Sequence, residues 1–263
     1  MRGGRSSGSW WVVKEGEETE MVIREEICIG CGRCEPYCPV GAIAPTDEKT
    51  NRGKDRKRID LAQCVECGAC LRSQICPVDA IFQQPLEWPR TLRAAFSNPL
   101  TEHKSTGHMG RGTEEMKTNE ITHRFVPGEV GVTLEMGRPG IGATLGEIEK
   151  MTRALAQWGV TFETDTPITS LMVDRKRGRF PKEVIGERVL SAIIEFKVPV
   201  EKLCSILPGL RELGERLTTV FSVGMISVLP EGRHDPIVDL LREAGVNLRP
   251  HGKVNLGLGR ALP

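Results

Sequence analysis

The placement of the cysteines constrains this chain more than any other feature, because eight of its nine cysteines lie in two short runs. The first run, CIGCGRCEPYC, begins at Cys28 and has the spacing C-x2-C-x2-C-x3-C. The second run, CVECGACLRSQIC, ends at Cys76 and has the spacing C-x2-C-x2-C-x5-C. Each run is followed directly by a proline. The two runs are therefore interpreted as near-copies of one metal-binding unit.

The spacing favours iron–sulfur clusters over zinc. Three thiolates on a C-x2-C-x2-C turn face one side of a tight loop, which suits three corners of a cubane cluster. Zinc is held by four ligands in a tetrahedron, often from two C-x2-C pairs, and two cysteine triplets fit that arrangement badly. The first residues, MRGGRSSGSWWVVKEGEE, lack the apolar core of an export signal, so we expect a cytoplasmic protein. Because the cytosol keeps thiols reduced, clustered cysteines are expected to bind metal rather than form disulfides.

The two runs resemble those of dicluster 2[4Fe–4S] bacterial-type ferredoxins, in which the fourth cysteine of each run ligates the cluster of the other run. The resemblance implies two [4Fe–4S] clusters with shared ligands. These are Cys28, Cys31, Cys34 and Cys76 for cluster 1, and Cys64, Cys67, Cys70 and Cys38 for cluster 2. The x5 spacing departs from the usual x3 of this family. We interpret the two extra residues as a tolerated loop insertion, with an altered docking surface as the alternative.

Other residues near the runs add weaker predictions. Gly30, Gly32 and Gly68 let the backbone approach sulfur closely and direct N–H groups toward it. Between the runs, DEKTNRGKDRKRIDL predicts a basic hairpin, which is either merely solvated or able to steer an acidic partner toward the clusters. Cys204, the ninth cysteine, lies in a helical pattern and is expected to be a buried structural thiol.

Charge and hydropathy bear on the class of partner. The 36 Lys and Arg residues balance 35 Asp and Glu residues, which gives no reason to expect nucleic acid or an acidic membrane surface. No apolar run approaches the roughly 18 to 20 residues of a membrane-spanning helix. We therefore expect a redox partner protein or catalytic subunit, with homo-oligomerisation as a further option.

The pattern along the chain divides it into three parts. Residues 1–82 are predicted to form the dicluster domain, entered by a hairpin made from WWVV and MVIREEI. Residues 83–127 contain several prolines and then a polar stretch, so they are predicted to be an extended linker or arm. The Gly-rich stretch GHMGRGT within this arm could hold an anion, although it lacks the ending of a P-loop. The histidines of the arm are expected to be solvated.

Residues 128–263 are predicted to form an α/β domain. VGVTLEM alternates apolar residues and predicts a half-buried strand, and TLGEIEKMTRALAQWG predicts an amphipathic helix. VTFE, PITSLMVD, VLSAIIEFKV and TTVFSVGMISVL are interpreted as strands, and Pro208 is expected to kink or restart the second helix. The order predicts an α+β protein whose C-terminal domain is a ferredoxin-like, ACT-like α/β sandwich. A further helix (DPIVDLLREAG) and strand are appended.

The loop MGRPGIGATLG, between the first strand and first helix of this domain, has three interpretations. In the first, Gly140, Gly142 and Gly146 form a dinucleotide fingerprint, and Glu163 is the acid that binds the ribose. This interpretation would allow a nucleotide or flavin to bind at the loop. Against this, the preceding strand alternates, whereas a central parallel strand is a nearly continuous apolar run. The R-P-G turn with its helix also resembles ACT domains, which bind small effectors there. The third interpretation is a tight structural connection.

The stretches GRGTEEMKTNEIT, GEVGVTLEMGRPG and VLSAIIEFKVP resemble the region that follows the ferredoxin unit in 6-hydroxynicotinate reductase-type proteins. This resemblance implies ferredoxin-dependent reduction of a nitrogen heteroaromatic ring, with substrate or cofactor held by the C-terminal domain. The cysteine runs themselves predict one-electron transfer in the iron–sulfur component of an anaerobic oxidoreductase. No catalytic residue can be assigned, because ring reduction also needs a proton donor and usually a two-electron centre.

Overall fold

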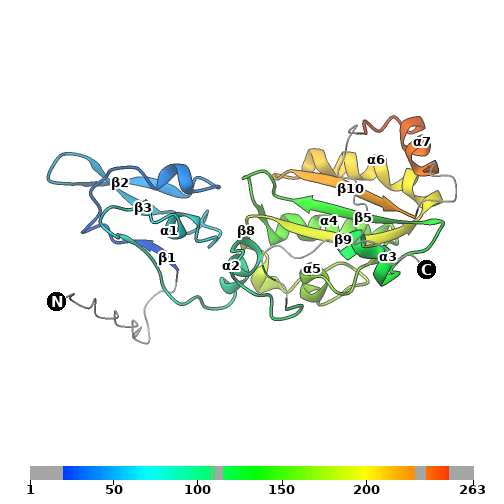
Figure 1. Cartoon of the computed structure of the whole chain (residues 1–263), viewed down its shortest axis with the longest axis horizontal. Coiled ribbons are helices and arrows are strands. Elements are labelled where there is room, and N and C mark those ends of the chain that lie inside the picture. Colours follow the sequence, from blue (N-terminus) through cyan, green and yellow to red (C-terminus); the bar gives the residue numbers. More distant parts are fainter. Residues whose placement is uncertain (1–19, 108, 110–114, 229–234, 249–263) are drawn as a thin grey trace, which may run out of the picture.

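A computed structural model describes residues 20–107, 109, 115–228 and 235–248. The described chain forms an N-terminal unit, coloured blue to cyan, and a larger C-terminal unit, coloured green to red (Figure 1). The segment that contains helix α2 (Thr91–Ser97) joins them. Within the described ranges, none of the helices is long and apolar enough to span a bilayer.

The N-terminal unit consists of two small antiparallel sheets that frame the cysteine runs. Its elements are β1 (Met21–Ile23), the 3-10 helix η1 (Glu35–Tyr37), β2 (Ile43–Lys49), β3 (Asp55–Ile59), α1 (Ala69–Arg72) and β4 (Ile81–Gln83). Strand β1 pairs with β4, so the first and last described strands close the unit. Strand β2 pairs with β3, which confirms the predicted hairpin between the runs. The WWVV half of the predicted entry hairpin lies outside the described residues.

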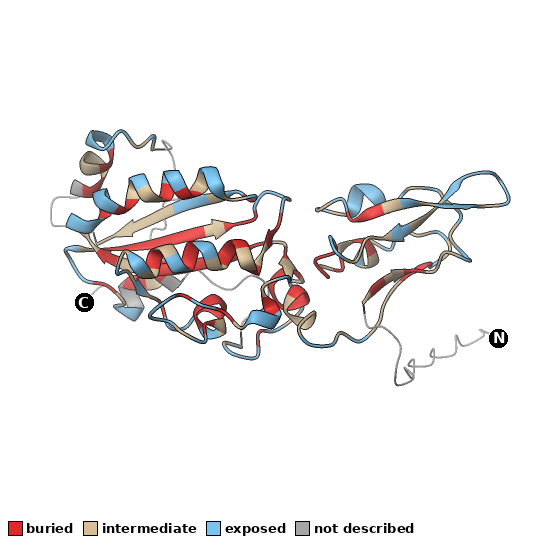
Figure 2. Ribbon diagram, turned by 180° about the vertical axis from the view of Figure 1, so that it is seen from behind, coloured by how far each residue is buried: buried red, intermediate tan, exposed pale blue. Residues whose placement is uncertain are grey.

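The C-terminal unit is built on a four-stranded antiparallel sheet with the order β10-β5-β9-β7. Its strands are β5 (Glu129–Met136), β6 (Ala143–Thr144), β7 (Thr161–Phe162), β8 (Arg188–Val189), β9 (Ala192–Pro199) and β10 (Phe221–Ser227). Its helices are α4 (Leu145–Gln157), α5 (Pro167–Leu171), the 3-10 helix η3 (Lys182–Val184), α6 (Val200–Arg216) and α7 (Pro236–Glu243). Counted along the chain, the sheet strands have the order 4-1-3-2, and α4 and α6 lie together in front of the sheet in Figure 2.

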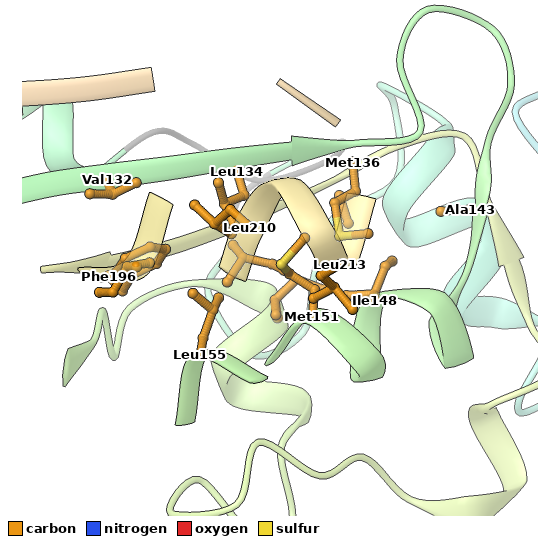
Figure 3. Packing of buried hydrophobic residues seen from close by; sticks show 14 of the residues in the cluster. Val132, Leu134, Met136, Ala143, Ile148, Met151, Leu155, Phe196, Leu210 and Leu213 are labelled. Carbon is orange, nitrogen blue, oxygen red and sulfur yellow. The ribbon is translucent and has the colours of Figure 1, made fainter. Parts of the chain in front are cut away.

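The main core lies between the sheet and these two helices. The apolar residues of β5 alternate as predicted, and Val132 and Leu134 are almost fully buried against Met151 and Leu210 from the helices (Figure 3). Burial of each such side chain contributes about 1.5–3 kcal/mol. The amphipathic pattern of α4 therefore determines which of its faces packs on the sheet. The helix begins where the Thr144 side chain accepts a hydrogen bond from the backbone of Glu147.

The opposite face of the sheet is also covered, so β5 is buried on both sides rather than half-buried. The covering elements are the 3-10 helix η2 (Glu115–Thr118) and α3 (Asn119–Thr122) of the predicted arm. A Cβ atom added at Gly131 would lie 2.7 Å from the Phe125 ring, so glycine permits this close layer. Glu195, on the same face, is fully buried and accepts a hydrogen bond from the Met116 backbone.

Three further predictions need correction. PITSLMVD begins with α5 rather than a strand, because Thr166 caps the helix by accepting from Thr169 and Pro167 occupies its first turn. Helix α6 runs through Pro208 as one helix, so the predicted restart is wrong, whereas the predicted kink stays a prediction. Cys204 is exposed rather than buried, since the core-facing positions of α6 are taken by neighbouring leucine and isoleucine residues.

The segment predicted as an extended linker contains α2, a helix that packs into the C-terminal core. Phe96 is 2% exposed within that core, and the Ser97 hydroxyl accepts a hydrogen bond of 2.8 Å from the Leu190 backbone. The appended helix is present as α7, capped by the Asp235 side chain. The predicted last strand lies mainly outside the described residues.

Candidate iron–sulfur centre

Four thiol groups line one small cavity of the N-terminal unit. Cys28, Cys31 and Cys34 come from the first run, and Cys76 comes from the end of the second. The remaining lining residues are Ile23, Ile29, Gly32, Arg33, Lys57, Val78, Ala80 and Ile81. The fold therefore brings together the four residues that the resemblance assigns to cluster 1, although Cys76 is far from the others in sequence.

The other four cysteines also come together. Burial raises the pKa of the Cys70 thiol to about 12, and the neighbouring thiolates of Cys67 and Cys38 raise it further. Burial likewise raises the pKa of Cys67, and the charge of Cys38 adds to the rise. Cys38 packs against the buried cluster that contains Cys64 and Cys70, so it lies beside the second run. Cys64 belongs to the same buried group, and burial raises its pKa to about 12.

In the first run, Cys34 shows the same effect on its pKa more weakly. Burial raises the pKa of Cys34 to about 11, and the thiolates of Cys31 and Cys28 contribute to the rise. Thiols with raised pKa values hold their protons near neutral pH and must release them to become metal ligands. Burial therefore disfavours free thiolates at Cys34, Cys64, Cys67 and Cys70 unless a bound metal group neutralises their charge.

Backbone N–H groups point at the fourth cysteine of each run in the same way. The Ala42 amide donates to Cys38 Sγ at 3.1 Å, and the Ala80 amide donates to Cys76 Sγ at 3.2 Å. Both bonds close the turn of a Cys-Pro-x-x-Ala stretch. Hydrogen bonds to ligand sulfur stabilise its negative charge, and so favour the reduced form of a bound cluster.

The donor set fits a cubane cluster better than a single ion. Within the described ranges, no three His, Cys, Asp or Glu side chains converge closely enough to hold one metal ion. A zinc ion would hold its thiolates at about 2.3 Å from one point. A four-iron cluster distributes its cysteine ligands over separate irons, so the more widely spaced thiols suit it.

The turns of the two runs share one backbone conformation but differ in side chain. Gly30 has a φ of 64°, and the equivalent Glu66 has a φ of 54°, a region that non-glycine residues rarely adopt. A Cβ atom at Gly30 would lie 2.6 Å from the carbonyl oxygen of Asp55, so only glycine fits there. The second run accommodates a glutamate at the equivalent position.

Glu66 is fully buried and forms a two-pronged ion pair. Its Oε1 accepts hydrogen bonds of 2.9 and 2.6 Å from Nε and Nη2 of Arg90, which directly precedes α2. Its Oε2 accepts a bond of 3.1 Å from the Met21 backbone at the start of β1. The carboxylate between Cys64 and Cys67 therefore joins three segments of the chain. Two-pronged pairs of this kind are strong and directional.

Arg93, on α2, links the second run to the C-terminal unit. Its Nη1 donates to the carbonyl oxygens of Cys64 at 2.7 Å and Leu61 at 2.8 Å. Its Nε donates to Glu187 Oε2 at 2.5 Å, just before β8. Sequence reasoning missed Glu66, Arg90 and Arg93. The signal for Glu66 was available, since aligning CIGC with CVEC places a glutamate opposite a glycine.

The glycine-rich loop after β5 packs closely against other parts of the chain, which disfavours the dinucleotide interpretation. Cβ atoms added at Gly140 and Gly142 would lie 3.1 Å from the Pro39 carbonyl oxygen and 2.9 Å from that of Val189. One at Gly146 would lie 3.0 Å from an Ile185 methyl group. A dinucleotide fold also needs parallel strands, whereas this sheet is antiparallel throughout. These contacts favour the structural interpretation, and nucleotide or effector binding at this loop stays a prediction.

Two further sequence candidates differ from expectation. Glu163, the proposed ribose-binding acid, is 8% exposed and forms an ion pair with Arg124. His103 is buried with its ring edge-on to Phe96 rather than solvated. His123 is exposed, as predicted. The GHMGRGT stretch lies mostly outside the described residues.

Comparison with known proteins agrees with this site. Residues 27–80 match the family described as 4Fe-4S dicluster domain. Ferredoxin-1 of Chlorobaculum tepidum is 38% identical over 69 residues, which cover 24% of this chain and 95% of that protein. The cysteine runs and the strands around them therefore correspond to almost the whole of a small ferredoxin.

Two larger relatives are components of redox complexes. One component of the ion-translocating oxidoreductase complex of Methanosarcina acetivorans is 44% identical over 67 residues, 26% of this chain and 22% of that protein. A component of the NADH-quinone oxidoreductase of Geobacter metallireducens is 37% identical over 57 residues, 20% of this chain and 42% of that protein. The chain thus spans less than half the length of either relative. These likenesses describe a module shared with such components.

Proposed function

The chain belongs to the 4Fe-4S dicluster ferredoxins through residues 27–80, and from this premise we propose that it is the low-potential electron-transfer component of an oxidoreductase. When bound, the two clusters would accept and release single electrons. The observation that carries the proposal is the cavity that gathers Cys76 with Cys28, Cys31 and Cys34. Cysteines exchanged between two runs are what a dicluster site requires.

We assign Cys28, Cys31, Cys34 and Cys76 as ligands of cluster 1, and Cys64, Cys67, Cys70 and Cys38 as ligands of cluster 2. Other residues of the N-terminal unit shield these ligands from water or donate hydrogen bonds to them. Ile23, Ala80 and Ile81 are nearly fully buried and exclude water from the cluster 1 cavity. The amides of Ala42 and Ala80 stabilise charge on the fourth cysteine of each run.

The C-terminal unit would position the electron-transfer unit against the catalytic component. The order 4-1-3-2 of its antiparallel strands, with α4 and α6 on one face, supports a ferredoxin-like α/β sandwich. Its ACT-like character, a small effector at the R-P-G turn and a homo-oligomeric state stay predictions. The M. acetivorans and G. metallireducens relatives are both components of oxidoreductases, which supports a role within a larger redox assembly.

Anaerobic reconstitution of the purified chain tests the proposal. We expect about eight iron and eight sulfide per chain and reversible bleaching by dithionite. Cys204→Ser is the matched control, because Cys204 is exposed on α6 and belongs to neither run. About two zinc ions without sulfide would contradict the proposal.

The resemblance to 6-hydroxynicotinate reductase-type proteins stays a prediction, and the same preparation tests it. Reduced viologen should be oxidised only slowly by the reconstituted chain alone. If adding 6-hydroxynicotinate accelerates the oxidation and yields a reduced ring, the chain is itself a reductase. An unchanged rate favours the role of electron carrier.

A further inference from the structure

The two cysteine runs are covered very differently, although their sequences match. Ile29 of the first run is 46% exposed, whereas Val65 at the equivalent position of the second run is 1% exposed. Cys31 is exposed, whereas its counterpart Cys67 is partly buried. On the side of the second run, Arg93 of α2 also binds the Cys64 carbonyl oxygen.

The cluster 2 site also faces the C-terminal unit on a second side. Pro39 and Val40, which follow the cluster 2 ligand Cys38, lie against the turn that contains Gly140 and Gly142. Two sides of the cluster 2 site are therefore occupied by the chain itself. A partner protein has more direct access to the cluster 1 site.

The exposed rim of the cluster 1 site is apolar at its centre. Ile27 is 41% exposed and Ile29 is 46% exposed, and Cys31, which lines the cavity with Ile29, is also exposed. The cavity lining includes the exposed Arg33 as well. Exposed apolar groups next to a redox site suit a transient protein contact, in which the redox groups of the two proteins must approach closely.

The β2–β3 hairpin adds positive charge to this rim. Residues 49–58 contain six lysines and arginines and a single acid, Asp55. The hairpin lies directly on the first run, since a Cβ atom at Gly30 would lie 2.9 Å from Cβ of Lys54. Arg56 donates to the Cys28 carbonyl oxygen at 3.3 Å. Arg52 and Lys54 are exposed near the hairpin turn.

The acids around this rim are partly neutralised. Glu35 is paired with Lys57, and Asp55 is paired with Lys49. Glu26 is exposed just before the first run and reduces the positive charge on that side. These pairs also neutralise Lys57 and Lys49, and Asp47 and Glu48 are exposed on β2. The excess positive charge of the hairpin side therefore comes from Arg52, Lys54, Arg56 and Arg58. Such a field attracts a negatively charged protein and sets its orientation.

We propose that this face, made of Ile27, Ile29, Cys31, Arg33 and the hairpin residues 49–58, docks an acidic redox protein that exchanges electrons with the cluster 1 site. This inference rests on the proposed function. With a cluster held by Cys28, Cys31, Cys34 and Cys76, this face would allow one electron to pass from the reduced partner, which would be oxidised by one electron, to that cluster. The cluster 2 site would then exchange electrons on the side that faces the C-terminal unit.

The test measures binding of the reconstituted chain to a flavodoxin of strongly negative net charge by isothermal titration calorimetry at several salt concentrations. We expect affinity to fall steeply with salt, because opposite surface charges are screened. In the triple variant Arg33→Glu, Arg52→Glu, Lys54→Glu, we expect binding at low salt to weaken by at least about tenfold. Binding that does not depend on salt would overturn the proposal.

The matched control carries the same charge change elsewhere. Arg175, Lys176 and Arg177 are exposed on a turn of the C-terminal unit, so their triple replacement by glutamate alters net charge equally. We expect this control to weaken binding less than about twofold. Equal weakening in both variants would overturn the proposal, as would tighter binding of a basic c-type cytochrome than of the flavodoxin.

Iron and sulfide contents separate this inference from the proposed function. If both triple variants retain about eight iron and eight sulfide and are still bleached by dithionite, a binding result bears on docking alone. If the variant with glutamate at positions 33, 52 and 54 loses its clusters, a variant with glutamine at these three positions is tested instead. Unchanged binding by the glutamine variant would then overturn the proposal while leaving electron transfer intact.

Discussion

Arg93 donates a hydrogen bond of 2.7 Å from Nη1 to the carbonyl oxygen of Cys64, a proposed ligand of cluster 2. The same side chain is paired with Glu187 of the C-terminal unit, and both side chains are largely buried. A single arginine therefore connects the loop that would hold cluster 2 to the α/β unit. Such a connection fixes the distance between the cluster 2 site and the C-terminal α/β unit.

Replacement of Arg93 by methionine tests this connection. The change leaves the largely buried Glu187 carboxylate without its guanidinium, so we expect the free energy of unfolding to fall by about 2–4 kcal/mol. Anaerobic denaturant unfolding of the reconstituted protein measures the loss. Arg216→Met is the control, because its pair with Glu212 is exposed and should contribute less than about 1 kcal/mol. Equal losses in the two variants would contradict a structural role for Arg93.

Glu66→Gln removes a buried negative charge beside the cluster 2 site and leaves Arg90 with its longer ion pair of 3.9 Å to Glu20. Because added positive charge favours the reduced cluster, we expect the midpoint potential of cluster 2 to rise. A redox titration followed by electron paramagnetic resonance measures both potentials. Glu26→Gln, an exposed change before the first run, should have a much smaller effect. A drop in potential for Glu66→Gln would refute the placement of its charge.

Gly140→Ala tests the contact between the glycine turn and the first run. The position has a φ of 63°, and the new Cβ atom would lie 3.1 Å from the Pro39 carbonyl oxygen. We expect a loss of unfolding free energy of about 1–2 kcal/mol from the backbone alone, with a further loss from crowding. Gly53→Ala is the control for backbone strain, since it also has a positive φ but no atom within 4 Å. If Gly140→Ala costs no more than Gly53→Ala, the turn does not press on the first run.

The sequence predicted the cysteine chemistry because that information is local. Spacing within each run determines which thiols share a loop, and the alternation of β5 and the period of α4 determine which residues enter the core. Glu66–Arg90 and Arg93–Glu187 escaped prediction because their partners are far apart in sequence and meet only in the folded chain. The helix at Pro167 was missed for another reason: a Thr-Pro start signal was present but was outweighed by β-branched residues.

The second layer on the sheet could not be predicted from β5 alone. Its alternation correctly indicates one buried face, but the other face is covered by η2 and α3, whose polar sequence carries little periodicity. Thr133 is buried there because a distant segment folds over it. The position of the arm depends on tertiary packing.

The central claim is that each run supplies its fourth cysteine to the other cluster, and Cys76→Ser tests it most directly. Reconstituted Cys76→Ser should lose or alter the same electron paramagnetic resonance signal as Cys31→Ser, while the signal altered by Cys64→Ser is retained. This outcome is predicted because Cys76 lines the cavity with Cys28, Cys31 and Cys34. If Cys76→Ser instead reproduces the spectrum of Cys64→Ser, the exchange of ligands between the runs is contradicted.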